Sequence, residues 1–229
     1  MKIIEELIEG IFLAECKNRF LCKVLINGIE VECYLPSSSK LEPLINLKGK
    51  KVLLTLNKAT NIRTKYSVFA VKHYNKYILL NLNVANLVLG EHLQKSYGFL
   101  RSSSVILREK TIEGYKADFA LLGEHKTLFE AKSIISTKQA TLFPSVNSNR
   151  AIEQLYKIGK LLDLGWNVQY YFISLSPFVK ILNINSQFQS YIEQFNNCLH
   201  KGMEVKGLGC SFLNNEVIIT HELKFISPK

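Results

Sequence analysis

Two acids and a lysine occur in one short segment of this chain at a spacing that suits metal chemistry. Asp118 and Glu130 each lie in an apolar run, a Gly-Glu-His turn separates the two runs, and Lys132 follows Glu130 by two residues. This pattern predicts a β-hairpin with Glu130 and Lys132 on the same face and Asp118 across from them. Carboxylate oxygens are suitable ligands for Mg²⁺, and a nearby lysine can hold an attacking water or stabilise charge on a phosphate.

An exposed strand face with alternating charges is the alternative explanation of this pattern. The neighbouring residues favour a site, because Phe119–Leu122 and Leu128–Phe129 are apolar runs typical of strands that are covered on both faces. A charge in such a strand is costly unless it coordinates an ion or forms an ion pair. Glu109, which follows Arg108, is either a third acid for the metal or the surface partner of a lysine.

The charge of the chain points to a polyanionic partner. The 229 residues carry a formal net charge of +10, which favours nucleic acid, with DNA ahead of RNA; a basic protein that merely tolerates its charge is the alternative. The five cysteines are odd in number and lack a C-x-x-C pair, which argues against a disulfide framework and a zinc ribbon. Without a signal peptide or a membrane-spanning run, we expect a cytoplasmic protein. The oligomeric state stays open, with a homodimer among the options.

The order of elements predicts two domains, 1–80 and 81–229. Short apolar runs separated by turns, including Asn27-Gly28, predict five or six strands in the first domain and favour a small barrel such as an OB-fold. In the second domain we expect a mixed α/β nuclease core, with 136–148 as a loop. Its predicted helices cover 83–96, 149–164 and 186–200, and its predicted strands cover 100–110, 116–122, 126–135, 168–175, 204–212 and 217–225.

Further residues could contact nucleic acid. In the first domain Arg19, Arg63 and Lys65 have aromatic neighbours, a combination that suits single-strand binding. On the helix after the core strands, Arg150 and Gln154 could lie near a scissile phosphate. A solvated loop and ordinary helix-surface polarity are the alternatives. No G-x-S-x-G, Walker A or G-x-G-x-x-G motif occurs, so serine hydrolase, P-loop and dinucleotide-binding functions lack support.

The chain resembles the sugar fermentation stimulation protein A family over most of its length. The resemblance is carried by short motifs: Asn18-Arg19-Phe20-Leu21, Leu47-Lys48-Gly49, Arg63-Thr64-Lys65-Tyr66, Arg108-Glu109, Asp118-Phe119, Phe129-Glu130-Ala131-Lys132-Ser133 and Phe143-Pro144. The chain departs from the family pattern at Glu32, where the family has histidine, at Lys116, where it has arginine, and at Ser145, where it has aspartate. These departures indicate a diverged member.

The resemblance implies an OB-like barrel followed by a PD-(D/E)xK nuclease-like domain. It implies that Asp118, Glu130 and the backbone carbonyl of Ala131 bind Mg²⁺ or Mn²⁺, that Lys132 orients or activates water, and that the barrel holds the strand. The expected function is metal-dependent cleavage of nucleic acid. A non-catalytic DNA-binding regulator of sugar metabolism genes is the main alternative, and a protein-interaction scaffold is the third.

Overall fold

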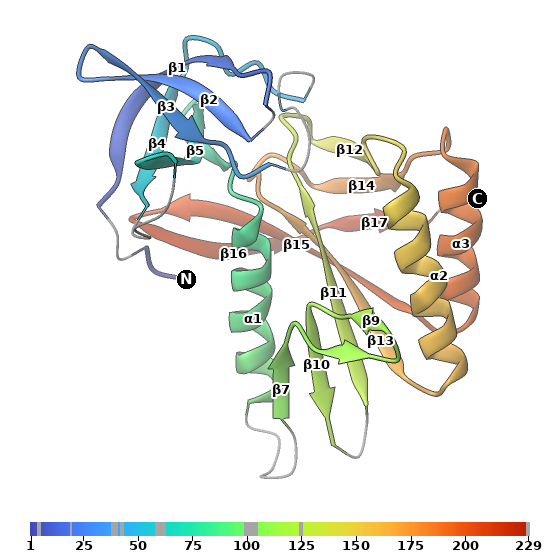
Figure 1. The fold of residues 1–229 in the computed structure, drawn as a ribbon. Helices are drawn as coiled ribbons and strands as arrows, with labels where there is room; N and C mark the ends of the chain where they lie inside the picture. Colours follow the sequence, from blue (N-terminus) through green and yellow to red (C-terminus); the bar gives the residue numbers. More distant parts are fainter. Residues whose placement is uncertain are drawn as a thin grey trace.

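The computed structural model describes the chain except for residues 4–5, 19, 38–40, 42–43, 58–62, 99–104, 124–125 and 228–229. The N-terminal part is a six-stranded sheet in the order β3-β2-β1-β4-β5-β6, and a further pairing between β3 and β5 curls it into a barrel (Figure 1). Its strands are β1 (Ile8–Glu15), β2 (Leu21–Ile26), β3 (Ile29–Tyr34), β4 (Lys51–Leu56), β5 (Tyr66–His73) and β6 (Lys76–Leu79). Asn27 and Gly28 both have positive φ, as a two-residue hairpin turn requires.

The second part is a mixed sheet in the order β16-β15-β13-β11-β10-β7. In chain order its strands are β7 (Val105–Arg108), β10 (Phe119–Leu122), β11 (Thr127–Ile134), β13 (Asn167–Ser174), β15 (Glu204–Leu213) and β16 (Glu216–Glu222). Strands β11, β13 and β15 run parallel, whereas β7, β10 and β16 pair antiparallel with their neighbours. The helices are α1 (Asn83–Tyr97), α2 (Asn149–Asp163) and α3 (Gln189–His200).

Both faces of this sheet are covered, which explains its nearly continuous apolar strands. Phe129 and Tyr171 pack in a cluster with residues of α1. Leu128 and Tyr170 point the other way, into a cluster with residues of α2 and α3. Alternate residues of a strand face opposite sides of the sheet, so both sets must be apolar. The sheet thus lies between α1 on one side and α2 with α3 on the other (Figure 1).

The structure corrects three expectations about local structure. The predicted loop 136–148 contains β12 (Ala140–Phe143), which pairs in parallel with β14 (Ile181–Ile184) and, through β14, with β17 (Lys224–Ile226). These strands are three or four residues long, too short for a clear periodic signal. The predicted strand 116–122 is interrupted at 117–118, since β8 (Thr111–Ile112) and β9 (Tyr115–Lys116) form a separate hairpin. The last predicted strand, 217–225, is divided between β16 and β17.

The barrel and the mixed sheet share a hydrophobic core. One cluster joins Leu53, Phe69 and Leu79 of the barrel to residues of α1 and to Phe129 and Tyr171 of the large sheet. Leu79 of β6 also donates a backbone hydrogen bond of 2.9 Å to Leu175, just after β13. Among the described residues, the helices are too short or too polar to cross a membrane.

Candidate metal centre

Asp118 lies just before β10, at the point where that strand stops pairing with β11. The last paired residues are Phe119 and Phe129, so the same register brings Asp118 opposite Glu130. The Asp118 carboxylate then takes the place of a strand partner: its Oδ2 accepts a 2.8 Å hydrogen bond from the backbone N–H of Ala131. Its Oδ1 accepts a 3.1 Å hydrogen bond from Asn86 of α1. Two elements therefore hold Asp118 beside the middle of β11.

Glu130 is buried, with 3% of its surface exposed. Its Oε2 accepts a 2.6 Å hydrogen bond from the Tyr115 hydroxyl, and its Oε1 accepts a 2.7 Å hydrogen bond from Nζ of Lys132. Lys132 also donates a 2.8 Å hydrogen bond to Gln154 Oε1 of α2, and its Nζ lies 5.7 Å from the ring centre of Tyr170. Glu130 and Lys132 thus share the face of β11 that α2 covers, as their two-residue spacing predicts.

Asp118 and Glu130 are neighbouring acids, and the groups around them offset only part of their negative charge. Burial and the nearby Glu130 carboxylate raise the pKa of Asp118 to about 6, although the Ala131 N–H, Lys132 and Asn86 oppose this rise. Burial and Glu130 also raise the pKa of Tyr115 far above its ordinary value, so this hydroxyl stays protonated and remains a donor. A cation placed between the carboxylates would relieve their repulsion.

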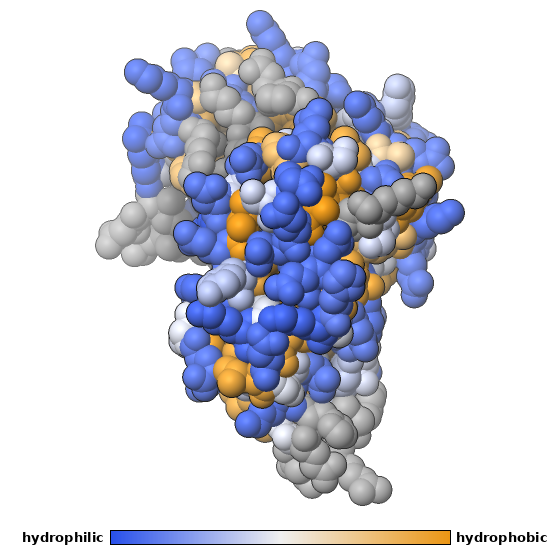
Figure 2. Space-filling view, turned by 90° about the vertical axis from the view of Figure 1, so that its right-hand side faces the viewer, coloured by the Kyte–Doolittle hydropathy of each residue, from blue (hydrophilic) through white to orange (hydrophobic). Residues whose placement is uncertain are grey.

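A cavity of about 450 Å³ opens over these residues. Asp118, Glu130 and Tyr115 line one side of it, and Glu109 and Lys116 also contribute. The opposite side comes from α2, through Arg150, Glu153, Gln154 and Lys157, which follow the i, i+3, i+4, i+7 spacing of one helix face. The outside of the molecule over α2 and α3 is largely hydrophilic (Figure 2), while Leu155, Ile158 and Leu161 of α2 point into the core.

Glu109, predicted as either a third metal-binding acid or the surface partner of a lysine, forms the lysine contact in this structure. Glu109 follows β7 with a positive φ of 49°, and its exposed carboxylate forms an ion pair with Lys116 at the cavity rim. Within the described part of the chain, no three His, Cys, Asp or Glu side chains gather closely enough to hold a metal ion. The surface-partner alternative therefore describes Glu109.

The residues predicted to contact nucleic acid are placed apart from one another. Arg150 and Gln154 line the cavity. On the barrel, Arg63 donates from Nε and Nη2 to the carboxylate of Glu32, at 3.0 and 3.4 Å. Lys65 is exposed, with Nζ 5.3 Å from the ring centre of Tyr66. Arg19 lies outside the described residues.

Tyr115 and Asn86 were not predicted as parts of the site, although both bind its carboxylates directly. Tyr115 could not be found from sequence, because it belongs to the small β8–β9 hairpin, which has no periodic signal of its own. Asn86 comes from a helix more than 30 residues earlier in the chain. The four polar residues at helical spacing on α2 are a signal that could have been used, since such a stripe often faces a solvent-filled cavity.

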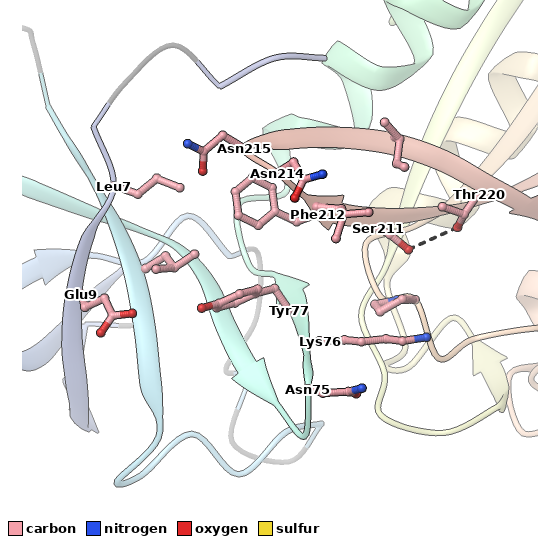
Figure 3. A pocket seen from close by; sticks show the side chains of 14 residues that line it. Leu7, Glu9, Asn75, Lys76, Tyr77, Ser211, Phe212, Asn214, Asn215 and Thr220 are labelled. Atoms are coloured by element: carbon pink, nitrogen blue, oxygen red, sulfur yellow. Dashed lines mark hydrogen bonds between the residues drawn. The ribbon is translucent and has the colours of Figure 1, made fainter.

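A second cavity, larger than the one over Asp118, lies between the barrel and the β15–β16 hairpin. It measures about 530 Å³. Tyr77 of β6 and Phe212 of β15 meet edge to face within it, with ring centres 5.8 Å apart (Figure 3). Glu9 is the one acid that lines it. The larger of the two cavities is therefore not the one that Asp118 and Glu130 line.

The fold defines a class: an OB-like barrel followed by a mixed α/β domain with three helices among its described residues. Two family models match, the sugar fermentation stimulation protein RE domain over residues 83–216 and the SfsA N-terminal OB domain over 15–80. The chain belongs to the sugar fermentation stimulation protein family.

Similar proteins span the same length. A sugar fermentation stimulation protein homolog of Desulfitobacterium hafniense is 25% identical, over 91% of each chain. A homolog of Caldanaerobacter subterraneus subsp. tengcongensis is 24% identical, over 99% of this chain and 100% of its own. The structure of Pyrococcus furiosus SfsA in complex with Ca²⁺ aligns with a TM-score of 0.84 at 21% identity, over 99% of each chain. This likeness shows that the two proteins share a fold.

Proposed function

We propose that this protein is a divalent-metal-dependent nuclease whose centre is formed by Asp118, Glu130 and Lys132. The observation that carries the proposal is that two buried or half-buried carboxylates line a single cavity and that Lys132 is hydrogen-bonded to one of them, in a chain of net charge +10. Hydrolysis of a phosphodiester requires stabilisation of negative charge and an oriented water, and these groups suit both tasks.

The donor atoms fit a small, hard cation. Asp118 and Glu130 supply carboxylate oxygens, and each oxygen keeps a further lone pair beside the hydrogen bond that it accepts. In a strand the N–H and C=O of one residue point to the same side. Because the N–H of Ala131 reaches Asp118, its carbonyl points to that side too. Two carboxylates and a carbonyl suit Mg²⁺ or Mn²⁺, and Mg²⁺ commonly keeps several waters.

When bound, a divalent ion supplies Lewis acidity that polarises phosphoryl oxygens and makes water more acidic. The chain itself would do the rest. Lys132, held between Glu130 and Gln154, would orient the attacking water and stabilise charge on the phosphate. Arg150 and Lys157 on the α2 side of the cavity would attract the phosphates. The Ca²⁺ complex of Pyrococcus furiosus SfsA supports a hard-cation site in this fold.

The test is a cleavage assay on labelled single- and double-stranded DNA and RNA, with Mg²⁺, Mn²⁺ or EDTA. Wild-type protein should cleave only with a divalent ion. Asp118→Asn should reduce cleavage at least 100-fold, while Glu109→Gln, at the cavity rim, serves as the matched acid-to-amide control and should keep most of it. Equal cleavage by wild type and Asp118→Asn would rule out this centre. Binding without any cleavage by wild type would favour the non-catalytic regulator.

A further inference from the structure

A cluster of cations surrounds the turn between β5 and β6. It is not part of the proposed metal centre. Lys50, Lys51, Lys72, His73 and Tyr74 line a shallow hollow of about 440 Å³ on the barrel, and Lys76 follows on β6. We call these six residues the β5–β6 surface. It is separate from the cavity over Asp118, because the two share no lining residue.

The charge of this surface is largely uncompensated. Lys51 forms a 2.9 Å ion pair with Glu9. For Lys50, Lys72 and Lys76 the described part of the chain holds no ion-pair partner within 4.0 Å. Three lysines therefore keep their charge available to a ligand. Lysines that are spread over neighbouring strands are suited to successive groups of a polyanion rather than to one small anion.

Aromatic rings lie among these lysines. Tyr74 is 82% exposed and has a positive φ of 52°, a backbone conformation that bulky residues seldom adopt. Its ring is 4.5 Å from that of His73, and both rings meet Phe178 of the β13–β14 loop edge to face. Nζ of Lys76 lies 5.9 Å from the centre of the Phe178 ring. The Tyr74 ring is thus exposed to solvent, while the rings of His73 and Phe178 pack against it.

A neutral His73 completes the arrangement. Nζ of Lys50 lies 3.2 Å from Nδ1 of His73. An ammonium group can only donate, so Nδ1 must accept and the ring is neutral in this contact. Burial and the Lys50 charge also lower the pKa of His73. The contact holds the Lys50 ammonium against His73, in the hollow that Tyr74 also lines.

From this combination we propose that the β5–β6 surface binds single-stranded nucleic acid, with Lys72 and Lys76 against phosphates and Tyr74 stacked on a base. Exposed cations with an exposed ring are the pattern that proteins use for single strands without strong sequence preference. A duplex or an anionic membrane would use the lysines and leave the ring without a role. The choice of nucleic acid as the ligand rests on the proposed function. It places the barrel contact away from Arg63, which Glu32 already binds.

The experiment measures anisotropy of a labelled single-stranded oligonucleotide of about 16 nucleotides, in EDTA so that no cleavage occurs, at several salt concentrations. The variant K72A/K76A should bind roughly 10- to 30-fold more weakly near 0.1 M salt and lower the log–log salt slope by about 1.4, or 0.7 for each lost phosphate contact. Tyr74→Ala should weaken binding roughly 5- to 100-fold, whereas Tyr74→Phe, which keeps the ring, should bind like wild type.

Three controls make the result decisive. K95A/K224A removes the same charge from exposed lysines on α1 and β17 and should change binding less than K72A/K76A. A matched duplex and anionic vesicles test the other polyanions. The proposal would be overturned if both lysine pairs gave equal losses, or if Tyr74→Ala had no effect. It would also be overturned if wild type did not bind single strands, or if the loss were seen only with duplex or vesicles. Unchanged melting temperatures check that the variants fold.

The outcomes are separable from those of the proposed function. If Asp118→Asn fails to affect cleavage but K72A/K76A loses single-strand binding, the nuclease centre is wrong and the β5–β6 surface stands. If cleavage of a short oligonucleotide depends on Asp118 while the β5–β6 variants bind normally, the reverse holds. Measuring binding in EDTA keeps the two results independent.

Discussion

At the scale of single residues, the clearest consequence of the structure is the cost of ionising Asp118. Its pKa is raised from 3.8 to about 6 by burial and by Glu130. In the unfolded chain the same group ionises near its ordinary value. A folded-state pKa above the unfolded one for an acid means that stability falls as pH rises between these values.

We therefore expect Asp118→Asn to be more stable than wild type at pH 7 in EDTA, by about 1–3 kcal/mol. The advantage should shrink as pH falls below 6, be small at pH 4, and vanish only near pH 3, about one unit below the unfolded pKa, where Asp118 is protonated in both states. Urea unfolding at pH 4, 5, 6 and 7 measures this difference. An advantage that is the same at every pH would show that the charge of Asp118 is not its cause.

Tyr115 gives a second prediction at this scale. Its hydroxyl donates a 2.6 Å hydrogen bond to buried Glu130, so Tyr115→Phe leaves that oxygen without this donor. Loss of a hydrogen bond to a charged group should cost about 1.5–3 kcal/mol of unfolding free energy. Tyr156→Phe is the matched control, because Tyr156 is 55% exposed on α2. Equal effects of the two substitutions in urea unfolding would contradict the role of the Tyr115 hydroxyl.

At the scale of elements, α2 supplies one wall of the cavity and contains a glycine that its geometry does not require. A Cβ at Gly159 would find its nearest neighbour, Asn197 Nδ2 of α3, at 3.7 Å, which is ordinary contact. Gly159→Ala should therefore stabilise the protein by about 0.5–1 kcal/mol through the backbone entropy of the helix. Thermal unfolding measures the change, and cleavage should be unaffected because Gly159 does not line the cavity.

Gly209 of β15, in contrast to Gly159, has no room for a side chain. A Cβ there would lie 2.1 Å from Nε2 of His221, which sits 2.8 Å from the carbonyl oxygen of Val179. Gly209→Ala must displace the imidazole, so we expect a loss of about 1–3 kcal/mol. If Gly209→Ala were as stable as Gly159→Ala in the same thermal experiment, the packing of His221 against β15 would be wrong.

At the scale of the whole molecule, the barrel and the α/β domain are joined by a common core. Phe69 of the barrel is 3% exposed, packs edge to face on Phe212 at 5.2 Å, and belongs to the cluster that contains Phe129 and Tyr171. Trp166, the one tryptophan, lies near the end of α2 and reports on the second domain. Such a core predicts that both domains unfold together.

Phe69→Ala should cost about 3–5 kcal/mol and shift the Trp166 fluorescence transition together with the far-UV circular dichroism transition. Leu56→Ala, on β4 with 43% exposure, is the matched barrel control and should cost well under 1 kcal/mol. A Trp166 transition that stays at the wild-type urea concentration would mean that the barrel unfolds independently.

The strands of the barrel, the three helices and the shared face of Glu130 and Lys132 could all be predicted from the residues alone. These features depend on local properties: the Asn27-Gly28 turn, the period of apolar residues, and the two-residue repeat of a strand. Long apolar runs such as Leu128–Phe129 also indicated a sheet covered on both faces, because such strands need no polar side.

The groups that contact these residues could not be predicted, because they are brought there by the packing of the elements. Tyr115, Asn86 and Gln154 reach the carboxylates or Lys132 from three different elements. Glu109, nine residues before Asp118, pairs with Lys116 instead. The short strands β12, β14 and β17 exist through pairing with one another. The β5–β6 surface likewise joins Lys50 and Tyr74 from separate segments, and Phe178 of the β13–β14 loop packs against Tyr74. Contacts of this kind depend on how elements pack, and a local pattern of residue types does not predict that packing.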